Sequence, residues 1–276
     1  MPQTLALDIG ATKTRIAVIS GIKIKDKKVI KTPKTKAEIT KALFNLIDSY
    51  RGIKKIGIGV AAFTRNGRTY GTPNMDYTGV DIKSILKNRY KIPVFVDNDA
   101  NCAGLAELYY GAGKGKKNFI LLTLGTGIGG AIIINGKIYR GTGFAGEPGH
   151  SLVRGKYFEH IASAPASVKL GQKLLKRKIT SEEIEKLADK GDKKAKKIYE
   201  IIGEYIGESL VNIAMYLDPE IIILGGGFAK VKHIYPSMLK TFKQKDIVPR
   251  KIPIVHAKLS DDAGLIGAAL LPKETI

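Results

Sequence analysis

The residues best suited to chemistry lie in short polar or glycine-rich segments that follow apolar runs. In the segment DIGATKT a carboxylate, Asp8, ends an apolar run, and a tight turn with hydroxyls and an amine follows. Gly10 lets backbone N–H groups approach an anion closely, while Thr12 and Lys13 can donate to phosphate oxygens. Asp8 would face the same phosphates, so a cation is needed between them, most naturally Mg²⁺ or its water shell. The alternative is an ordinary turn with a capping aspartate, because this pattern alone is weak.

Two further segments place glycines directly after apolar runs that are typical of buried strands. Residues 125–130 (GTGIGG) hold four glycines in six positions, which removes side chains where a backbone must touch something closely. Thr126 and Gly127 are the candidate phosphate contacts in this segment, unless it is only a mobile hairpin loop. The third glycine turn consists of Gly225, Gly226 and Gly227. It suits a flat adenine or ribose lying against backbone, or simply close packing of a helix on a strand.

Carboxylate, amide and imidazole groups in two other segments could bind and activate an alcohol. In the segment DNDAN, Asp99 can accept a proton from a hydroxyl while the amide of Asn98 orients that hydroxyl. The alternative role for Asp99 is to cap the helix that begins there. In the segment GEPGH, Glu147 and His150 lie on one rigid turn and could bracket vicinal hydroxyls of a sugar. The alternative there is a loop with an incidental histidine.

An internal repeat provides the elements that must position these groups. Residues 4–24 align with residues 119–139 without a gap, so the turn after Asp8 matches the 125–130 loop. Each copy is an apolar strand, a glycine and threonine loop, a second apolar strand and a glycine turn. The order β-β-β-α-β-α-β, given twice, differs from a Rossmann series because no helices separate the first three strands. We therefore expect two mixed sheets flanked by helices, with a cleft between two lobes that can grip a polyphosphate.

Periodicity and capping patterns predict the individual elements. The predicted strands are Thr4–Asp8, Arg15–Ser20, Ile22–Ile30, Lys55–Val60, Pro93–Val96, Phe119–Leu124, Ala131–Ile134, Lys137–Tyr139, Glu220–Leu224 and Pro253–Lys258. Asn135-Gly136 predicts a type I′ hairpin turn. Predicted helices begin near Thr35, Asp81, Asp99, Ser181, Asp192 and Asp262. Residues 64–79 and 141–154 are expected to be irregular. The final helix should return to the first lobe, which gives a small lobe of residues 1–97 plus about 260–276 and a large lobe of residues 98–259.

Composition limits the remaining possibilities. The single cysteine, Cys102, excludes an internal disulfide and any cysteine-based zinc site, so a reducing cytoplasm fits. No segment resembles a signal peptide, and the most apolar stretch is shorter than the ~20 apolar residues of a membrane span. The net charge of +21 would attract nucleic acid or an anionic surface. We favour a solvated, lysine-rich surface, because the charges are scattered and no aromatic residues interleave with them as a stacking platform.

Five segments together resemble the ROK (repressor, open reading frame, kinase) family of sugar kinases: DIGATKTR, DNDANCAGLAE, TLGTGIGGAII, GFAGEPGH and LGGGFA. They occur in family order and nearly span the chain. The resemblance implies an α/β, two-lobed actin/hexokinase/Hsp70-like fold (duplicated ribonuclease H-like) with an interdomain cleft. It also implies in-line transfer of the γ-phosphoryl group of MgATP to a sugar hydroxyl, with Asp99 as the catalytic base. The family positions that hold sugar hydroxyls match Asn74, Asn98, Glu147, His150 and Glu159.

One departure from the family is sharp. ROK kinases often carry a cysteine cluster after the GEPGH-like turn, which binds a structural zinc together with its histidine. The matching span here, Ser151–Glu159, has no cysteine, so we expect no zinc site and only a sugar-binding role for His150. The loop must then be held by packing of Tyr157 and Phe158. Zinc-less members of this compact kind resemble archaeal hexokinases of broad sugar range.

The leading hypothesis is a cytoplasmic, ATP-dependent hexokinase or glucokinase that acts on a 6-hydroxyl, with Mg²⁺ held by Asp8, through water. The alternative within enzymes is a kinase for N-acetylated amino sugars or fructose, because loop 64–79 governs what fits at the 2-position. A sugar-responsive DNA-binding repressor is another class, but only seven residues precede Asp8, which leaves no room for a helix-turn-helix module. A nucleotide-driven interaction protein is a third class, which has no need of a sugar-hydroxyl clamp. Family analogy favours a homodimer, and we expect no specific nucleic-acid or membrane partner.

Overall fold

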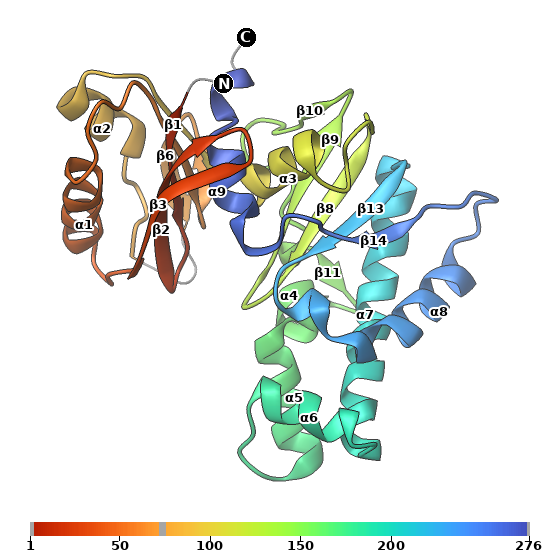
Figure 1. The fold of residues 1–276 in the computed structure, drawn as a ribbon. Coiled ribbons are helices and arrows are strands. Elements are labelled where there is room, and N and C mark those ends of the chain that lie inside the picture. Colours follow the sequence, from red (N-terminus) through yellow and green to blue (C-terminus); the bar gives the residue numbers. More distant parts are fainter. Residues whose placement is uncertain (1–2, 72–75, 275–276) are drawn as a thin grey trace. The chain divides into compact units, whose positions relative to one another are not determined.

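The computed structural model describes residues 3–71 and 76–274 of the chain (Figure 1). Its contacts group the chain into two compact units. Unit 1 consists of Met1–Lys117, Ala131–Gly146 and Lys258–Ile276, and unit 2 consists of Asn118–Gly130 and Glu147–Ala257. The lobe boundaries expected near residues 97 and 260 are not tested by this grouping and stay a prediction.

The first five-stranded sheet belongs to unit 1. Its strands are β1 (Thr4–Ile9), β2 (Lys13–Ser20), β3 (Lys23–Lys31), β4 (Ile56–Val60) and β7 (Val94–Asn98), in the order β3-β2-β1-β4-β7. Strand β2 is antiparallel to β1 and β3, whereas β1, β4 and β7 run parallel. Strands β1 and β4 are buried along their whole length, which explains their nearly continuous apolar sequences. The strands predicted here are confirmed, and β7 extends past its predicted end to include Asp97 and Asn98.

The second five-stranded sheet repeats this scheme. Its strands are β8 (Phe119–Leu124), β9 (Ile128–Ile134), β10 (Lys137–Ile138), β13 (Ile221–Gly225) and β14 (Ile254–His256), in the order β10-β9-β8-β13-β14. Strand β10 is antiparallel to β9, and β13 is parallel to both β8 and β14. Asn135 and Gly136 have φ values of 52° and 73°, as the predicted type I′ turn requires. Matching strands occupy matching places in the two sheets, so the duplication inferred from the repeat is confirmed.

Helices cover both faces of the first sheet (Figure 1). They are α1 (Lys36–Asp48), α2 (Ile82–Tyr90), α3 (Asp99–Tyr110) and α9 (Ala263–Ala268). Helix α1 begins at the predicted capping box, in which the side chains of Thr35 and Glu38 each accept the other's backbone N–H. Asp81 caps α2 by accepting from the N–H of Ser84 at 2.9 Å. Each such cap stabilises its helix by about 1 kcal/mol, which is why these two helix starts were predictable.

Unit 2 is built around one long helix. Its helices are α4 (Phe158–Ala162), α5 (Ala164–Leu175), α6 (Ser181–Asp189), α7 (Lys193–Leu217) and α8 (Tyr235–Lys245). Helix α7 is capped by Asp192, whose side chain accepts from the N–H of Ala195 at 2.8 Å. The helix contacts α4, α5, α6 and α8. The cap of α6 is Thr180, one residue before the predicted Ser181. Within residues 3–71 and 76–274, no helix has both the length and the apolar character to cross a bilayer.

The segment predicted to be irregular at residues 64–79 contains a hairpin. Strand β5 (Phe63–Arg65) pairs with β6 (Arg68–Gly71) through an Asn66-Gly67 turn. Both turn residues have positive φ, 53° and 85°, so this Asn-Gly pair is the same hairpin signal as Asn135-Gly136, and the prediction of an irregular segment is wrong here. The two strands are too short for a hydrophobic alternation to reveal them.

The segment predicted as a loop at residues 141–154 also contains regular structure. A 3₁₀ turn, Pro148–His150, leads into β11 (Leu152–Val153), which pairs with β12 (Lys156–Tyr157). Phe158 is fully buried, as predicted for a loop held by packing, but Tyr157 is 49% exposed, so its predicted packing role is wrong. Helices α4 and α5 follow at once and were not predicted.

Glycines let α9 lie directly on its neighbours in unit 1. A Cβ added at Gly267 would be 1.6 Å from the carbonyl oxygen of Cys102 in α3, and one added at Gly57 in β4 would be 1.9 Å from that of Ala268. Helix α9 also contacts β1, as expected of a final helix that returns to the first part of the chain. No residue larger than glycine fits at these two positions without a shift of the backbone.

We predict that Gly267→Ala lowers the free energy of unfolding by about 3 kcal/mol or more, because the new methyl group overlaps the backbone of α3. Gly52→Ala is the control. A Cβ there meets nothing within 4 Å, so only the left-handed φ of 68° is penalised, by about 1–2 kcal/mol. Urea denaturation followed by circular dichroism measures both variants, and equal midpoints would contradict the close contact.

Candidate functional site

A tight turn between β1 and β2 carries the first candidate ligand groups. The N–H of Gly10 donates to the carbonyl oxygen of Lys13 across the turn at 3.1 Å. Thr32, which directly follows β3, stabilises this turn through two hydrogen bonds. Its N–H donates to the carbonyl oxygen of Thr12 at 3.0 Å, and its hydroxyl donates to the carbonyl oxygen of Gly10 at 2.6 Å. The side chains of Thr12 and Lys13 are exposed and make no hydrogen bond or ion pair with any described residue. Both can therefore donate to a ligand.

Asp8 lies at the end of β1, opposite Arg15 in the register of β2. Its Oδ2 is 2.7 Å from Nη1 of Arg15, and the residue is only 7% exposed. Burial raises the pKa of Asp8 although the charge of Arg15 opposes this, and the negative charge of Asp262 also raises it. A cation would relieve such a carboxylate. Mg²⁺ is usually held by one or two carboxylates together with phosphate oxygens, so Asp8 fits a magnesium site, directly or through water.

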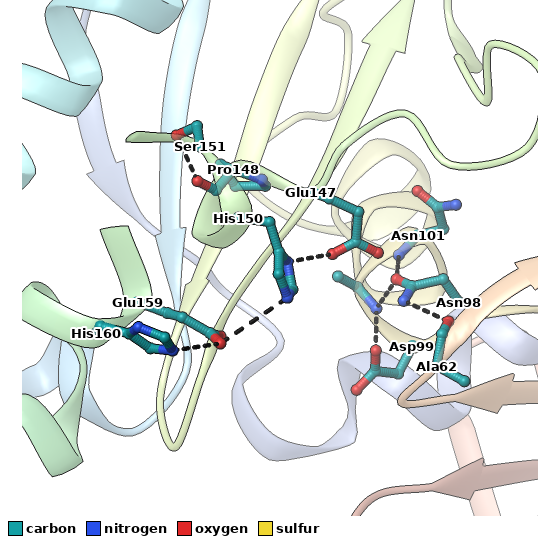
Figure 2. Close-up of polar contacts among 11 residues, drawn as sticks. Ala62, Asn98, Asp99, Asn101, Glu147, Pro148, His150, Ser151, Glu159 and His160 are labelled. Carbon is teal, nitrogen blue, oxygen red and sulfur yellow. Dashed lines mark hydrogen bonds and ion pairs between the residues drawn. The ribbon is translucent and has the colours of Figure 1, made fainter. Parts of the chain in front are cut away.

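Asp99 is the first residue of α3 and directly follows β7 (Figure 2). The helix cap is Asn98, whose Oδ1 accepts from the N–H groups of Ala100 (2.8 Å) and Asn101 (3.2 Å). Nδ2 of Asn98 donates to the carbonyl oxygen of Ala62 at 3.2 Å, so one amide hydrogen remains for a ligand. Oδ1 of Asp99 accepts only from Ala100, and its Oδ2 has no hydrogen bond to another described residue. The capping alternative for Asp99 is therefore wrong.

The surroundings of Asp99 favour its protonated form. Burial, together with the nearby negative charge of Asp8, raises the pKa of Asp99 to about 6, against the opposing hydrogen bond from Ala100. Gly59 in β4 permits this burial, because a Cβ there would be 3.4 Å from Cα of Asp99 and 3.1 Å from Sγ of Cys102. A carboxylate with a pKa this close to neutrality is well suited to take a proton from an alcohol.

A buried network holds the first turn of α3 in place. Oδ1 of Asp97, a residue 5% exposed, accepts from the N–H of Asn98 (2.7 Å) and from Nδ2 of Asn101 (2.9 Å). Oδ2 of Asp97 accepts a hydrogen bond from Nε of Arg140 at 2.7 Å and also lies 2.7 Å from Nη2 of the same side chain. The two residues therefore form a charge-assisted pair. No local sequence pattern reveals Arg140, because it lies 43 residues from Asp97. Arg140 therefore helps to fix Asp97, which in turn holds the first turn of α3.

The glycine loop between β8 and β9 offers backbone groups rather than side chains. The N–H of Gly125 donates to the carbonyl oxygen of Gly127, and the N–H of Ala164 donates to that of Gly125, both at 3.0 Å. The second bond ties the loop to the start of α5. Thr126 is exposed at the tip. Because β9 begins at Ile128, the last two glycines of GTGIGG belong to a strand, which corrects the predicted strand start at Ala131.

Three predicted sugar-binding side chains gather in unit 2 (Figure 2). Nδ1 of His150 is 3.7 Å from Oε2 of Glu147, and its Nε2 is 3.9 Å from Oε1 of Glu159. His160 approaches the same Glu159 oxygen to 3.9 Å. The structure thus brings the two polar residues of the GEPGH turn together with Glu159 of α4. These separations exceed hydrogen-bond length, so they are ion-pair contacts rather than hydrogen bonds.

This cluster lies against the glycine loop of the same unit. A Cβ added at Gly127 would be 2.9 Å from Oε2 of Glu159. One added at Gly149 would be 2.2 Å from the carbonyl oxygen of Ile128, so the GEPGH turn sits directly on the start of β9. A candidate phosphate loop and a candidate polyol cluster are therefore neighbours, as phosphoryl transfer to a hydroxyl requires.

The third glycine turn serves packing at two of its positions. Gly226 has φ 85°, and a Cβ there would be 2.3 Å from the carbonyl oxygen of Leu124. A Cβ at Gly225 would lie 3.3 Å from Cβ of Ala257, whereas one at Gly227 would meet nothing within 4 Å. Close packing thus explains Gly226, and Gly227 alone presents open backbone to a flat ligand group.

Sugar binding by Asn74 and the absence of a zinc site both stay predictions. Asn74 lies outside the described residues. Across residues 3–71 and 76–274, no three or more His, Cys, Asp or Glu side chains are grouped so that they could hold a metal ion. The absence of a zinc site from Ser151–Glu159 stays a prediction.

Arg15 was not among the predicted site residues, although the sequence contains a signal for its pairing with Asp8. A hairpin closed by the Gly10–Lys13 turn places Asp8 opposite Arg15 in the antiparallel register, so opposite charges face each other across two strands. Counting residues outward from the turn would have found the pair.

Relatives of known family match almost the whole chain. Residues 4–275 match the ROK family. A glucokinase of Halalkalibacterium halodurans is 31% identical over 312 residues, covering 98% of this chain and 94% of that protein. An N-acetyl-D-glucosamine kinase of Pasteurella multocida is 28% identical over 296 residues, covering 96% and 97%. The crystal structure of a ROK family glucokinase from Streptomyces griseus in complex with glucose and AMPPNP has a TM-score of 0.87 at 29% identity, covering 98% of this chain and 99% of that one. The chain belongs to the ROK family and has the actin/hexokinase-like fold that the resemblance implied.

Proposed function

We propose that this chain is an ATP-dependent sugar kinase of the hexokinase or glucokinase type, which transfers the γ-phosphoryl group of MgATP to the 6-hydroxyl of a hexose. Membership of the ROK family supports the proposal, as does the glucokinase relative that aligns over nearly the whole chain. Glucose is the first candidate sugar, because the Streptomyces griseus glucokinase was crystallised with it and with AMPPNP. A homodimer and a cytoplasmic location stay predictions.

The observation that carries the proposal is the state of Asp99. Burial and the negative charge of Asp8 raise the pKa of its carboxyl group to about 6. The Oδ2 atom of Asp99 has no hydrogen bond to another described residue. The helix cap falls on Asn98 instead, so the fold does not need Asp99 for helix capping. A half-buried carboxylate with a raised pKa, and with one oxygen that accepts no hydrogen bond from a described residue, supports a role toward a ligand.

In the proposed reaction the sugar 6-hydroxyl donates a hydrogen bond to the Asp99 carboxylate. The hydroxyl oxygen forms a bond to the γ-phosphorus while the bond from that phosphorus to the β,γ-bridging oxygen breaks, and ADP leaves with the bonding electron pair. The hydroxyl proton passes to Asp99. Because the transition state is loose, positioning and charge neutralisation contribute more than the strength of the base.

The phosphates are proposed to be held by donors from the two glycine turns. Thr12 and Lys13 supply exposed side-chain donors, and Thr126 and Gly127 supply a hydroxyl and backbone N–H groups. Mg²⁺, held by Asp8 through water, supplies neutralisation of charge on the phosphate oxygens when it is bound. Gly10 keeps the first turn tight, and the 225–227 turn is the proposed place of the adenine or ribose.

The sugar is proposed to be held by Asn98, Glu147, His150, Glu159 and Asn74. The alternative substrate class is an N-acetylated amino sugar or fructose, which the Pasteurella multocida relative supports for the amino sugars. A coupled assay with glucose, N-acetylglucosamine, N-acetylmannosamine and fructose decides between these classes by kcat/KM. No turnover with any of them would reject the kinase proposal.

We predict that Asp99→Asn lowers kcat for sugar phosphorylation about 10²–10⁴-fold, because the variant side chain cannot accept the proton. Binding of AMPPNP, measured by calorimetry, should stay within about twofold of the wild type, well under the tenfold that 1.4 kcal/mol represents. Asp26→Asn, at an exposed strand position, is the matched control and should leave kcat unchanged. Retained turnover in the Asp99 variant would mean that another residue is the base.

We predict that kcat/KM rises about tenfold per pH unit below pH 6 and then levels off, because only the ionised Asp99 accepts the proton. Stability should change in the opposite direction. Between the ordinary pKa of 3.8 and the folded pKa of about 6, the native state binds more protons than the unfolded state. The contribution of Asp99 to the free energy of unfolding therefore falls as pH rises through this window.

The Asp99→Asn variant provides the control for this linkage. It lacks the titrating group, so its free energy of unfolding should increase relative to the wild type between pH 4 and pH 7, as measured by urea denaturation. A difference between the two proteins that does not change with pH would contradict the raised pKa.

We predict that Glu159→Gln raises KM for the sugar about 10–100-fold, as expected for loss of a hydrogen bond to a charged group, with KM for ATP changed less than about twofold. Glu182→Gln, at an exposed position in the first turn of α6, is the matched control and should change neither constant. Steady-state kinetics with each substrate varied in turn provides the measurement. A rise in KM for ATP alone would mean that Glu159 binds the nucleotide and not the sugar.

A further inference from the structure

Unit 1 contains a cavity that the proposed reaction does not use. It has a volume of about 510 Å³ and is bordered by the β5–β6 turn, the start of α2, the end of β7, residues 140–143 and the last turn of the described chain. The charged residues that line it are Arg65, Lys83, Asp97, Arg140 and Glu274. All of them belong to unit 1. The cavity is therefore a feature of one unit.

Two of the lining cations have no partner among the described residues. Neither Arg65 nor Lys83 makes an ion pair or a side-chain hydrogen bond with any residue in 3–71 or 76–274. Their aliphatic stems are nevertheless well placed by glycines. A Cβ added at Gly143 would be 2.8 Å from Cγ of Arg65, and one at Gly67 would be 2.3 Å from Cβ of Lys83. The stems rest on bare backbone, which limits the freedom of the two charged groups.

The lining acids do not balance these cations. Asp97 is already paired with Arg140 through two contacts of 2.7 Å. Glu274 is the only other carboxylate on the described lining, and its Oε2 accepts from the N–H of Ile138 at 3.4 Å. Glu274 is therefore the one carboxylate on the described lining that could balance the two positive charges of Arg65 and Lys83. The side chain of Arg140 is 36% exposed, so part of its guanidinium also remains accessible.

We propose that this cavity binds a small phosphate-bearing molecule, with the phosphate group held by Arg65, Lys83 and the exposed part of Arg140. Guanidinium groups donate in a fixed fork that matches phosphate oxygens, and a lysine adds a point charge. The hydroxyl of Thr142 on the same lining provides a neutral donor. A volume of about 510 Å³ lies within the range of small-molecule sites and admits either free phosphate or a sugar phosphate.

Occupancy of this site is coupled to Asp99 through two residues. A phosphate that binds Arg140 competes with Asp97 for the same guanidinium. Asp97 in turn fixes the N–H of Asn98 and the side chain of Asn101, which set the first turn of α3. A bound phosphate should therefore change kcat more than KM for ATP. This coupling rests on the proposed kinase function, whereas the binding itself does not.

The test is calorimetry on the full chain without nucleotide, with inorganic phosphate and glucose 6-phosphate as separate probes. The double variant Arg65→Gln/Lys83→Gln removes both unpaired cations and should weaken binding at least about tenfold, the effect of losing one charge-assisted hydrogen bond. Lys87→Gln is the matched control, because Lys87 lies one turn along α2 and lines a neighbouring cavity but not this one. Its affinity should equal that of the wild type.

Absence of saturable binding for both probes up to about 1 mM, an affinity of only about −4 kcal/mol, would overturn the proposal. Equal affinity in the double variant and the wild type would also overturn it, because the probe would then occupy another place. Tighter binding of glucose 6-phosphate than of phosphate would support a sugar phosphate as the ligand, and the reverse would support free phosphate. Saturable, variant-sensitive binding in a protein that phosphorylates no sugar would support this site while rejecting the kinase function.

Discussion

Two carboxylates of like charge, the buried Asp8 and the half-buried Asp99, are held within unit 1, where the charge of one acts on the other. Desolvation raises the pKa of each, and the charge of Asp8 adds to the shift at Asp99. Such a pair persists only where the surrounding backbone leaves the chain no other conformation. Strand register sets Asp8 against Arg15, and the Asn98 cap with the Asp97–Arg140 pair sets the start of α3. A cation bound beside Asp8 would offset the repulsion between the two carboxylates.

Glycines provide the close approaches that make this arrangement possible, mostly through their small size. A Cβ at Gly264 would lie 3.0 Å from Cγ of Asp8, and one at Gly59 would lie 3.4 Å from Cα of Asp99. In unit 2, Gly127 plays the same part toward Glu159. The glycine-rich segments are therefore rigid contact points between backbone and functional side chains. Only some of them, such as Gly226 and Gly143, also require a positive φ.

The two copies of the repeat share a scaffold and differ in chemistry. The sheets have the same strand order, and the turn after β1 corresponds to the loop after β8. Where the first copy has Asp8 and Arg15, the second has Thr123 and Gly130. The first turn therefore brings a carboxylate, a cation and exposed donors, whereas the second brings hydroxyls and bare backbone. Duplication with divergence of this kind has kept the backbone of the turn and changed the side chains that it carries.

The sequence by itself determined the repeat, the strands of the two five-stranded sheets, the capped starts of α1, α2 and α7, and the candidate residues near each glycine turn, because these depend on local periodicity and spacing. It could not separate a capping role from a catalytic one at Asp99, since both place a carboxylate at a helix start. Only the tertiary structure showed that Asn98 makes the cap and that Asp99 is half-buried where the charge of Asp8 raises its pKa, and the catalytic role of Asp99 stays a proposal. The Arg140–Asp97 pair, the contact of Glu159 with Gly127 and the cavity beside Arg65 were equally hidden. Each joins residues far apart in the chain, and distances between such residues are set by packing rather than by any local pattern.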